Sequence, residues 1–245
     1  MNFKLKHIDI ISAEKVDYTA LMKDERGIKK YRFWQIFTFL NNFKKTQLQV
    51  EELRHIDFKT IAEVDDCKIK KPSDISLIPF SAAIEIQSLF SEDNSEESIG
   101  ELMAKTIAMC CFSENHYKVK FDSDSIEYKN FLEKVRNSEL LSMVGIYHWI
   151  DKEFTESDVT WNKLFSEVSV PDKNYDEAGG HRMNGFKIIT TIKNICRDFN
   201  VPYEESLQIP YGITQASALE AATQAHIQHL MTESIERKMR NERKN

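Results

Sequence analysis

The spacing of apolar residues along the chain predicts a mainly α-helical protein. Apolar side chains recur every three or four residues through most of the sequence, which places them on one face of a helix. The first such segment follows Lys23 and is rich in aromatic residues, with Phe33, Ile36, Phe37, Leu40 and Phe43 on one face. Residues 3–11 instead alternate between apolar and polar, which predicts a short N-terminal strand.

A break at Pro72 divides the predicted elements into two parts. Pro72 stands in a polar run, Lys70 to Asp74, which is typical of a boundary between structural units. We therefore expect an N-terminal segment, 1–71, and a helical domain, 72–245. Within the first part, residues 47–66 are mixed in character and predict a partly helical segment.

Five helices are predicted between Pro79 and Val168. The first begins at Pro79 and continues through Phe90, and the second covers 102–112. The third begins at a capping box formed by Asp124 and Glu127. The fourth covers 140–154, and the fifth is capped by Thr155 or Asp158 and continues through Val168.

The remainder of the chain predicts loops and a long terminal helix. Residues 116–121 predict a charged hairpin or loop, and 169–182 predict a long loop of the kind that is often functional. A helix is expected over 183–199 and at most one helical turn over 203–207. A single long helix is expected over about 214–240, so the architecture is an irregular multi-helix bundle ending in a long helix.

Composition supports helices and a reducing compartment. Only 7 Gly and 5 Pro occur in 245 residues, which is too few for the turns of an all-β fold. The net charge of −6 repels nucleic acid and anionic membrane surfaces. We expect no signal peptide and no membrane span, because charges interrupt every apolar run. The four cysteines lack a CxxC spacing and are expected to be free, buried thiols.

The candidate motifs for catalysis depart from their patterns. Residues 180–187 read Gly-His-Arg-Met-Asn-Gly-Phe-Lys and approach a phosphate-binding loop, but Phe186 separates the second glycine from the lysine. Lys187 is followed by Ile188, where a hydroxyl would be needed to hold magnesium. We expect no enzymatic activity and no cofactor.

Two histidines on the terminal helix form the best candidate for a metal site. His226, His229 and Glu233 fall within an arc of about 60° on one helix face. Zinc requires a further ligand that the sequence does not name. The arc borders an apolar side that includes Leu230, so histidines packing at a helix boundary are the favoured interpretation.

The same helix carries a second pattern that predicts binding to a partner. The apolar residues Ile227, Met231, Ile235 and Met239 recur every four positions, and an amphipathic helix can place such a stripe in a partner's groove. The alternative is that this stripe packs on the protein's own body.

The last third of the chain resembles a known family. After the helix that ends at Phe199, the sequence reads Asn-Val-Pro-Tyr-Glu-Glu-Ser-Leu-Gln-Ile-Pro-Tyr-Gly and then enters the helix containing Ser217-Ala-Leu-Glu-Ala-Ala. This layout resembles that of phage tail assembly chaperones, in which an aromatic, acidic and proline-containing segment joins a helical body to a terminal helix. The acidic, helical chain also resembles the baseplate hub assembly protein of contractile-tailed myophages.

The resemblance implies a non-enzymatic assembly factor that acts in the host cytoplasm during virion morphogenesis. Its partners would be baseplate hub or tape-measure proteins, bound through the stripe and through Tyr203 and Leu207 of the linking segment. Self-association is a further possibility. The alternatives are a metal-binding helical enzyme that uses His226, His229 and Glu233, and a helical regulator that binds nucleic acid.

Overall fold

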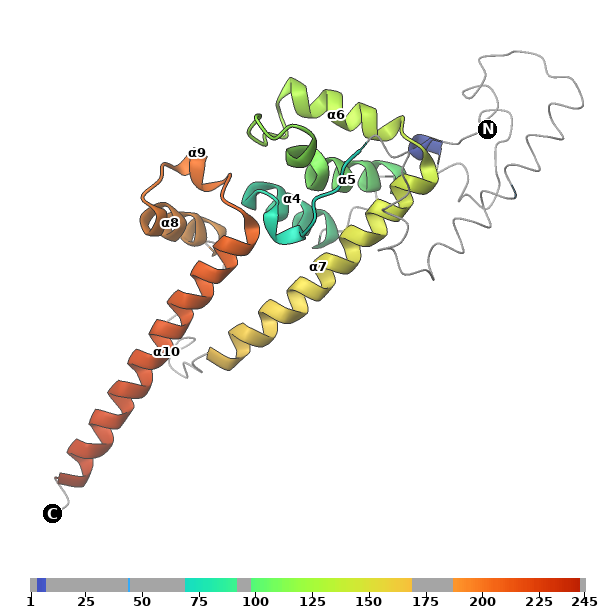
Figure 1. Ribbon diagram of the computed structural model, residues 1–245. Helices are drawn as coiled ribbons and strands as arrows, with labels where there is room; N and C mark the ends of the chain where they lie inside the picture. Colours follow the sequence, from blue (N-terminus) through green and yellow to red (C-terminus); the bar gives the residue numbers. More distant parts are fainter. Residues whose placement is uncertain (1–3, 8–43, 45–68, 92–97, 169–186, 243–245) are drawn as a thin grey trace, which may run out of the picture. The chain divides into compact units, whose positions relative to one another are not determined.

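A computed structural model of the chain describes residues 4–7, 44, 69–91, 98–168 and 187–242 (Figure 1). These residues are mainly helical and include no β-strand, which confirms the predicted fold class. With the labels of Figure 1, the helices are α4 Phe80–Ser91, α5 Ile99–Asn115, α6 Ile126–Arg136, α7 Leu140–Val168, α8 Lys187–Phe199, α9 Tyr203–Ser206 and α10 Tyr211–Glu242, with 3-10 turns η1 Leu5–His7 and η2 Ile75–Leu77. None of the helices in the described ranges has an apolar stretch long enough to cross a bilayer.

The chain divides into two compact units, 1–153 and 154–245. This division differs from the boundary predicted at Pro72. The backbone before Pro72 is tied to the end of α5, because Asn115 Nδ2 donates a 2.7 Å hydrogen bond to Lys70 O and Lys70 N donates to Asn115 Oδ1 at 3.1 Å. Residues 69–71, directly before Pro72, therefore contact the first unit, and the boundary at Pro72 stays a prediction.

Helix α5 is the centre of the first unit. It packs against α4 and α6, and ten of its seventeen residues are buried. Ser98 caps its N-terminus, where the Ser98 Oγ accepts a 3.2 Å hydrogen bond from Glu101 N. A helix that is covered on several sides has no single polar face, so its sequence is apolar almost throughout. This is why the apolar run over 102–112 predicts a core helix.

Aromatic rings join α5 to α6. Phe112 stacks on His116 with ring centroids 4.7 Å apart, and three more rings meet Phe112 at 5.8–5.9 Å in tilted or edge-to-face contacts. We call this set the aromatic cluster, and its members are Phe112, His116, Phe121, Tyr128 and Phe131. Such ring geometries add to the free energy gained by burial alone.

The start of α6 is one residue later than the capping box predicts. Ser125 is the N-cap, and its Oγ accepts a 3.1 Å hydrogen bond from Tyr128 N. Asp124 instead belongs to the preceding turn, because its own N–H donates to Asp122 Oδ1 at 2.9 Å. Residues 116–121 form turns and loop without a strand.

The predicted break within α7 is wrong. Helix α7 is continuous over Leu140–Val168, and neither Thr155 nor Asp158 caps a separate helix. Residues 150–160 contain no Gly or Pro to interrupt the backbone hydrogen bonds. Nearby in the same helix, Thr160 Oγ1 donates a 2.8 Å hydrogen bond to Glu156 O, one turn earlier. The hydroxyl of Thr160 therefore has its hydrogen-bond partner within the helix.

Most of the predicted N-terminal strand, 3–11, lies outside the described residues. In its described part, Leu5–His7 is a 3-10 turn and Lys4 forms an isolated antiparallel bridge with Glu139. Leu5 is fully buried, and its N–H donates a 3.0 Å hydrogen bond to Ser138 O. These two interactions fix the position of the segment.

Several predictions lie outside the described residues. These are the aromatic helix over 23–43, the mixed segment 47–66, the loop 169–182 and the near-phosphate-loop before Lys187. Among the cysteines, Cys110 and Cys111 are free and buried, as expected, whereas Cys196 is free and half-buried.

In the second unit, α8 packs against α9 and α10. Helix α8 buries Ile192 and Ile195, and it ends in a Schellman motif. Asn200 adopts a left-handed φ of 50°, Asn200 N donates to Arg197 O at 3.4 Å and Val201 N donates to Cys196 O at 3.1 Å. The predicted end of the helix at Asn200 is confirmed.

Helix α10 begins at Tyr211, three residues before the predicted start. The Pro210-Tyr211-Gly212 sequence, which predicts a stop, is instead the point of entry into the helix. Pro210 O accepts hydrogen bonds from Ile213 N at 3.0 Å and Thr214 N at 3.2 Å, and a proline is well tolerated there because it has no N–H to leave unpaired. Tyr211 and Thr214 are buried, so this first turn is anchored by packing.

Candidate protein interaction surface

Helix α10 has two parts that differ in their surroundings. Its first part, from Tyr211 to His226, includes buried and half-buried residues, whereas every residue from Ile227 to Asn241 is exposed. Figure 1 shows α10 continuing well past α8 and α9. We call Ile227–Glu242 the projecting segment. Because the packed part has already nucleated the helix, each further residue that is fixed gains a hydrogen bond without a new nucleation cost.

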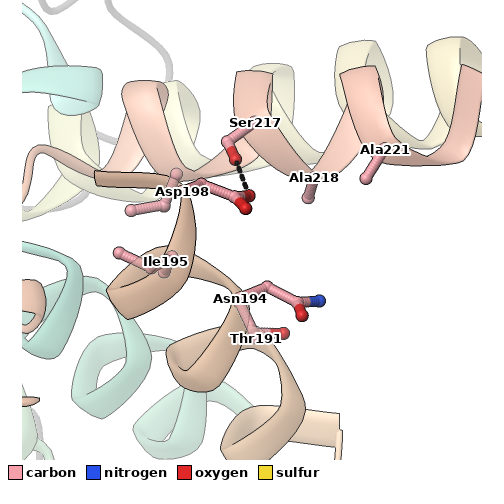
Figure 2. Close-up of a pocket in the computed structure, with 8 residues that line it drawn as sticks. Thr191, Asn194, Ile195, Asp198, Ser217, Ala218 and Ala221 are labelled. Atoms are coloured by element: carbon pink, nitrogen blue, oxygen red, sulfur yellow. Dashed lines mark hydrogen bonds between the residues drawn. The ribbon is translucent and has the colours of Figure 1, made fainter. Parts of the chain in front are cut away.

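Small and polar residues join the packed part of α10 to α8. A groove between them is lined by Thr191, Asn194, Ile195, Asp198, Thr214, Ser217, Ala218 and Ala221, and Figure 2 draws these side chains as sticks. Ser217 Oγ donates a 3.1 Å hydrogen bond to Asp198 Oδ2, while Arg197 Nε donates to Asp198 Oδ1 at 3.0 Å.

This groove is too small to be a substrate site. Its free volume is about 40 Å³, enough for a few water molecules at most. Pockets that bind metabolites or drug-sized ligands are typically about 300–1,000 Å³. We therefore interpret the groove as an imperfectly filled helix interface.

The four predicted stripe residues share one exposed face of the projecting segment. Ile227, Met231, Ile235 and Met239 are each between 48% and 61% exposed. At about 100° per residue they span an arc of about 120°. The alternative, in which the stripe packs on the protein's own body, stays a prediction. Leu230, which is 50% exposed, extends the stripe on one side, and its i+3 spacing from Ile227 is the signal that identifies it.

Charged residues occupy the opposite face and pair with one another. His229 Nε2 lies 3.5 Å from Glu233 Oε1, Arg237 Nη2 lies 3.6 Å from Glu233 Oε2, and Arg240 Nη2 lies 3.3 Å from Glu236 Oε2. All these pairs join positions i and i+4, and the five residues lie within an arc of about 100°. The projecting segment is therefore amphipathic: one face has ion pairs within the helix and the other has exposed apolar side chains.

Tyr203 and Leu207 lie elsewhere in the second unit. Tyr203 is the first residue of α9 and is 59% exposed, whereas Leu207 is the C-cap of α9 and is half-buried. Ile227 is 16 residues beyond the start of α10, about 24 Å along the helix. The structure therefore does not bring these two residues together with the stripe into one continuous surface.

The candidate metal ligands do not form a cluster. His229 is paired with Glu233, and the buried Nδ1 of His226 has no hydrogen-bond partner in the described structure. No group of three or more His, Cys, Asp or Glu side chains with a geometry suited to a metal ion occurs within the described ranges.

Comparisons of the chain with protein-family models, curated proteins and solved structures found no match. The candidate surface therefore stands on geometry alone.

Proposed function

We propose that this protein is a non-enzymatic, chaperone-like assembly factor for a phage tail baseplate hub. In this proposal it acts in the host cytoplasm and presents α10 to hub or tape-measure components. The observation that carries the proposal is the exposed apolar stripe, which lies opposite a face where Glu233 and Glu236 are paired with residues of the same helix. The likeness of the last third of the chain to tail assembly chaperones gives the class of partner.

The stripe is suited to helix-in-groove recognition. Side chains that are half exposed in the free protein can still gain from burial, at roughly 1 kcal/mol each. Four such residues would contribute roughly 4 kcal/mol before the cost of association is subtracted. The stripe alone would therefore support only weak binding, about millimolar at best, which suits a factor that must leave its partner when assembly is complete.

The proposal is tested by co-expressing the tagged full-length chain with baseplate hub and tape-measure proteins encoded beside it. We expect capture of one of these proteins, and at least tenfold weaker capture by the double variant Met231→Glu/Ile235→Glu. Ala225→Glu is the matched control, because it adds a carboxylate at an exposed position outside the stripe. Two results would refute the proposal. One is equal capture by the wild type and the double variant, and the other is that neither the hub nor the tape-measure protein is captured.

A further inference from the structure

Two methionines stand on the apolar stripe, and both side chains are open to solvent. Met231 is 61% exposed and Met239 is 48% exposed. Three other methionines of the described residues belong to the core of the first unit, where Met103, Met109 and Met143 are at most 7% exposed. An oxidant dissolved in water must reach the sulfur, so among these five the two methionines of the stripe are the accessible ones.

We propose that Met231 and Met239 form an oxidation site, at which a peroxide makes the apolar stripe polar. The reaction is a two-electron oxidation of each thioether to a sulfoxide. A new S–O bond forms as the O–O bond of hydrogen peroxide breaks. The sulfur is oxidised and the peroxide is reduced, and the second oxygen of the peroxide leaves as water.

The positions of the two methionines determine what oxidation does to the stripe. Isoleucines and methionines alternate along it, in the order Ile227, Met231, Ile235 and Met239. A sulfoxide oxygen accepts hydrogen bonds from water, so burying it in a partner's apolar groove costs free energy. Oxidation therefore places a polar group between Ile227 and Ile235 and leaves no two successive residues of the stripe apolar.

Oxidation at these positions should leave the fold intact. Every residue from Ile227 to Asn241 is exposed, so neither sulfoxide is placed in a core. A sulfoxide at Met143, which is fully buried in α7, would instead disrupt the packing around it. The stripe can therefore change its polarity while the rest of the protein keeps its structure. Methionine sulfoxide reductases, one for each epimer of the sulfoxide, can reverse the change.

Peptide mapping by mass spectrometry tests the selectivity of the site. The native full-length protein is sampled during treatment with hydrogen peroxide. Sulfoxide is expected to form at Met231 and Met239 at least about tenfold faster than at Met103, Met109 and Met143. Similar rates at all five methionines would overturn the proposal, because the stripe would then have no special reactivity.

Hydrophobic-interaction chromatography measures the polarity of the stripe, with Met231→Leu/Met239→Leu as the matched control. Leucine is apolar and of similar volume, and it has no sulfur to oxidise. The wild type is expected to elute earlier after peroxide treatment and to regain its first elution position after treatment with both reductases. The leucine variant should elute at the same position before and after peroxide.

Two results of the chromatography would overturn the proposal. One is a wild type whose elution does not change with peroxide or is not restored by the reductases. The other is a leucine variant that shifts as much as the wild type. Both proteins contain Cys196, together with the methionines that lie outside the described residues, so an equal shift would assign the change to those residues.

The consequence for partner binding rests on the proposed function. The oxidised wild type is expected to capture hub or tape-measure proteins at least about tenfold more weakly than the untreated wild type, whereas the leucine variant should capture them with or without peroxide. Undiminished capture by the oxidised wild type would overturn this effect on binding. If the untreated protein captures neither partner, the proposed function fails, while peptide mapping and chromatography still decide whether the oxidation site exists.

Discussion

Arg136 in the last turn of α6 donates two hydrogen bonds to Glu101 in the first turn of α5. The distances are 3.1 Å from Nε to Oε2 and 2.5 Å from Nη2 to Oε1. Both side chains are about one-third exposed. The carboxylate lies near a helix N-terminus and the guanidinium near a helix C-terminus, so each charge also matches the dipole of its own helix.

This forked pair should be coupled more strongly than the surface pairs of α10. A double-mutant cycle with Glu101→Gln and Arg136→Met is expected to give a coupling energy of about 1 kcal/mol, measured by urea denaturation. The control cycle uses Glu236 and Arg240, whose single contact is exposed, and should give less than about 0.5 kcal/mol. Equal coupling in the two cycles would contradict the importance assigned to the forked geometry.

Ile195 should be essential for holding α8 against α10. It is 2% exposed and lines the groove between the two helices. We expect Ile195→Ala to lower the free energy of unfolding by about 2–4 kcal/mol, because it leaves a cavity. Ile189→Ala on the same helix removes the same atoms from a side chain that is 61% exposed, and should cost less than about 1 kcal/mol. Similar losses for both variants would show that Ile195 is not buried as described.

Tyr128→Phe should be neutral or stabilising. The hydroxyl of Tyr128 is buried in the aromatic cluster, where it has no hydrogen-bond partner in the described structure. Burial, with the nearby carboxylates of Glu85 and Glu101 adding to it, raises the pKa of this phenol well above its usual range. Removing an unsatisfied hydroxyl should raise the free energy of unfolding by up to about 1 kcal/mol, measured by chemical denaturation. A loss of more than about 1 kcal/mol would indicate an unseen partner.

Glu85 should make stability depend on pH. Burial raises the pKa of this carboxyl, and the charges of Asp124 and Asp122 raise it further against the lowering effect of the Ser123 hydrogen bond. Since the folded pKa exceeds the unfolded one, the fold favours the protonated acid. Its stabilising contribution is complete below the unfolded pKa and is lost as pH rises through the folded pKa.

Glu85→Gln removes this titration while keeping an acceptor for Ser123 Oγ, which donates to Glu85 at 3.2 Å. We expect the variant to be more stable than the wild type at pH 7, by less than about 1 kcal/mol because the site is partly solvated. The difference should shrink towards pH 4. Thermal unfolding across this range measures it, and an advantage that grows as pH falls would contradict the sign.

The sequence predicts the elements whose signals are local. The Schellman ending at Asn200 depends on neighbouring residues, and the core character of α5 depends on its unbroken apolar run. The contact between Asn115 and Lys70 was not predictable, because it joins residues that are 45 positions apart in the sequence. The continuity of α7 was missed because Thr155 and Asp158 can either cap a helix or lie on its exposed side, and only tertiary context decides.

The candidate surface was also only partly predictable from the sequence. The four-residue spacing identifies the stripe, but a spacing cannot show whether the apolar face is covered. Exposure depends on the whole fold. Ile227 is exposed and Ile195 is buried, although both lie in regular helical patterns. A deletion that starts at residue 214, the predicted start of the terminal helix, would remove Thr214, which is buried and lines the groove between α8 and α10.

Truncation after His226 tests the central claim most directly, since it removes only the projecting segment and the residues after it. The account predicts that the shortened chain keeps the thermal unfolding midpoint of the full-length protein within about 2 °C, because no buried residue of α10 is lost. It also predicts that co-expressed hub and tape-measure proteins are no longer captured. A shortened chain that is folded and still captures its partner at the full-length level would contradict the claim that the projecting segment is the binding surface.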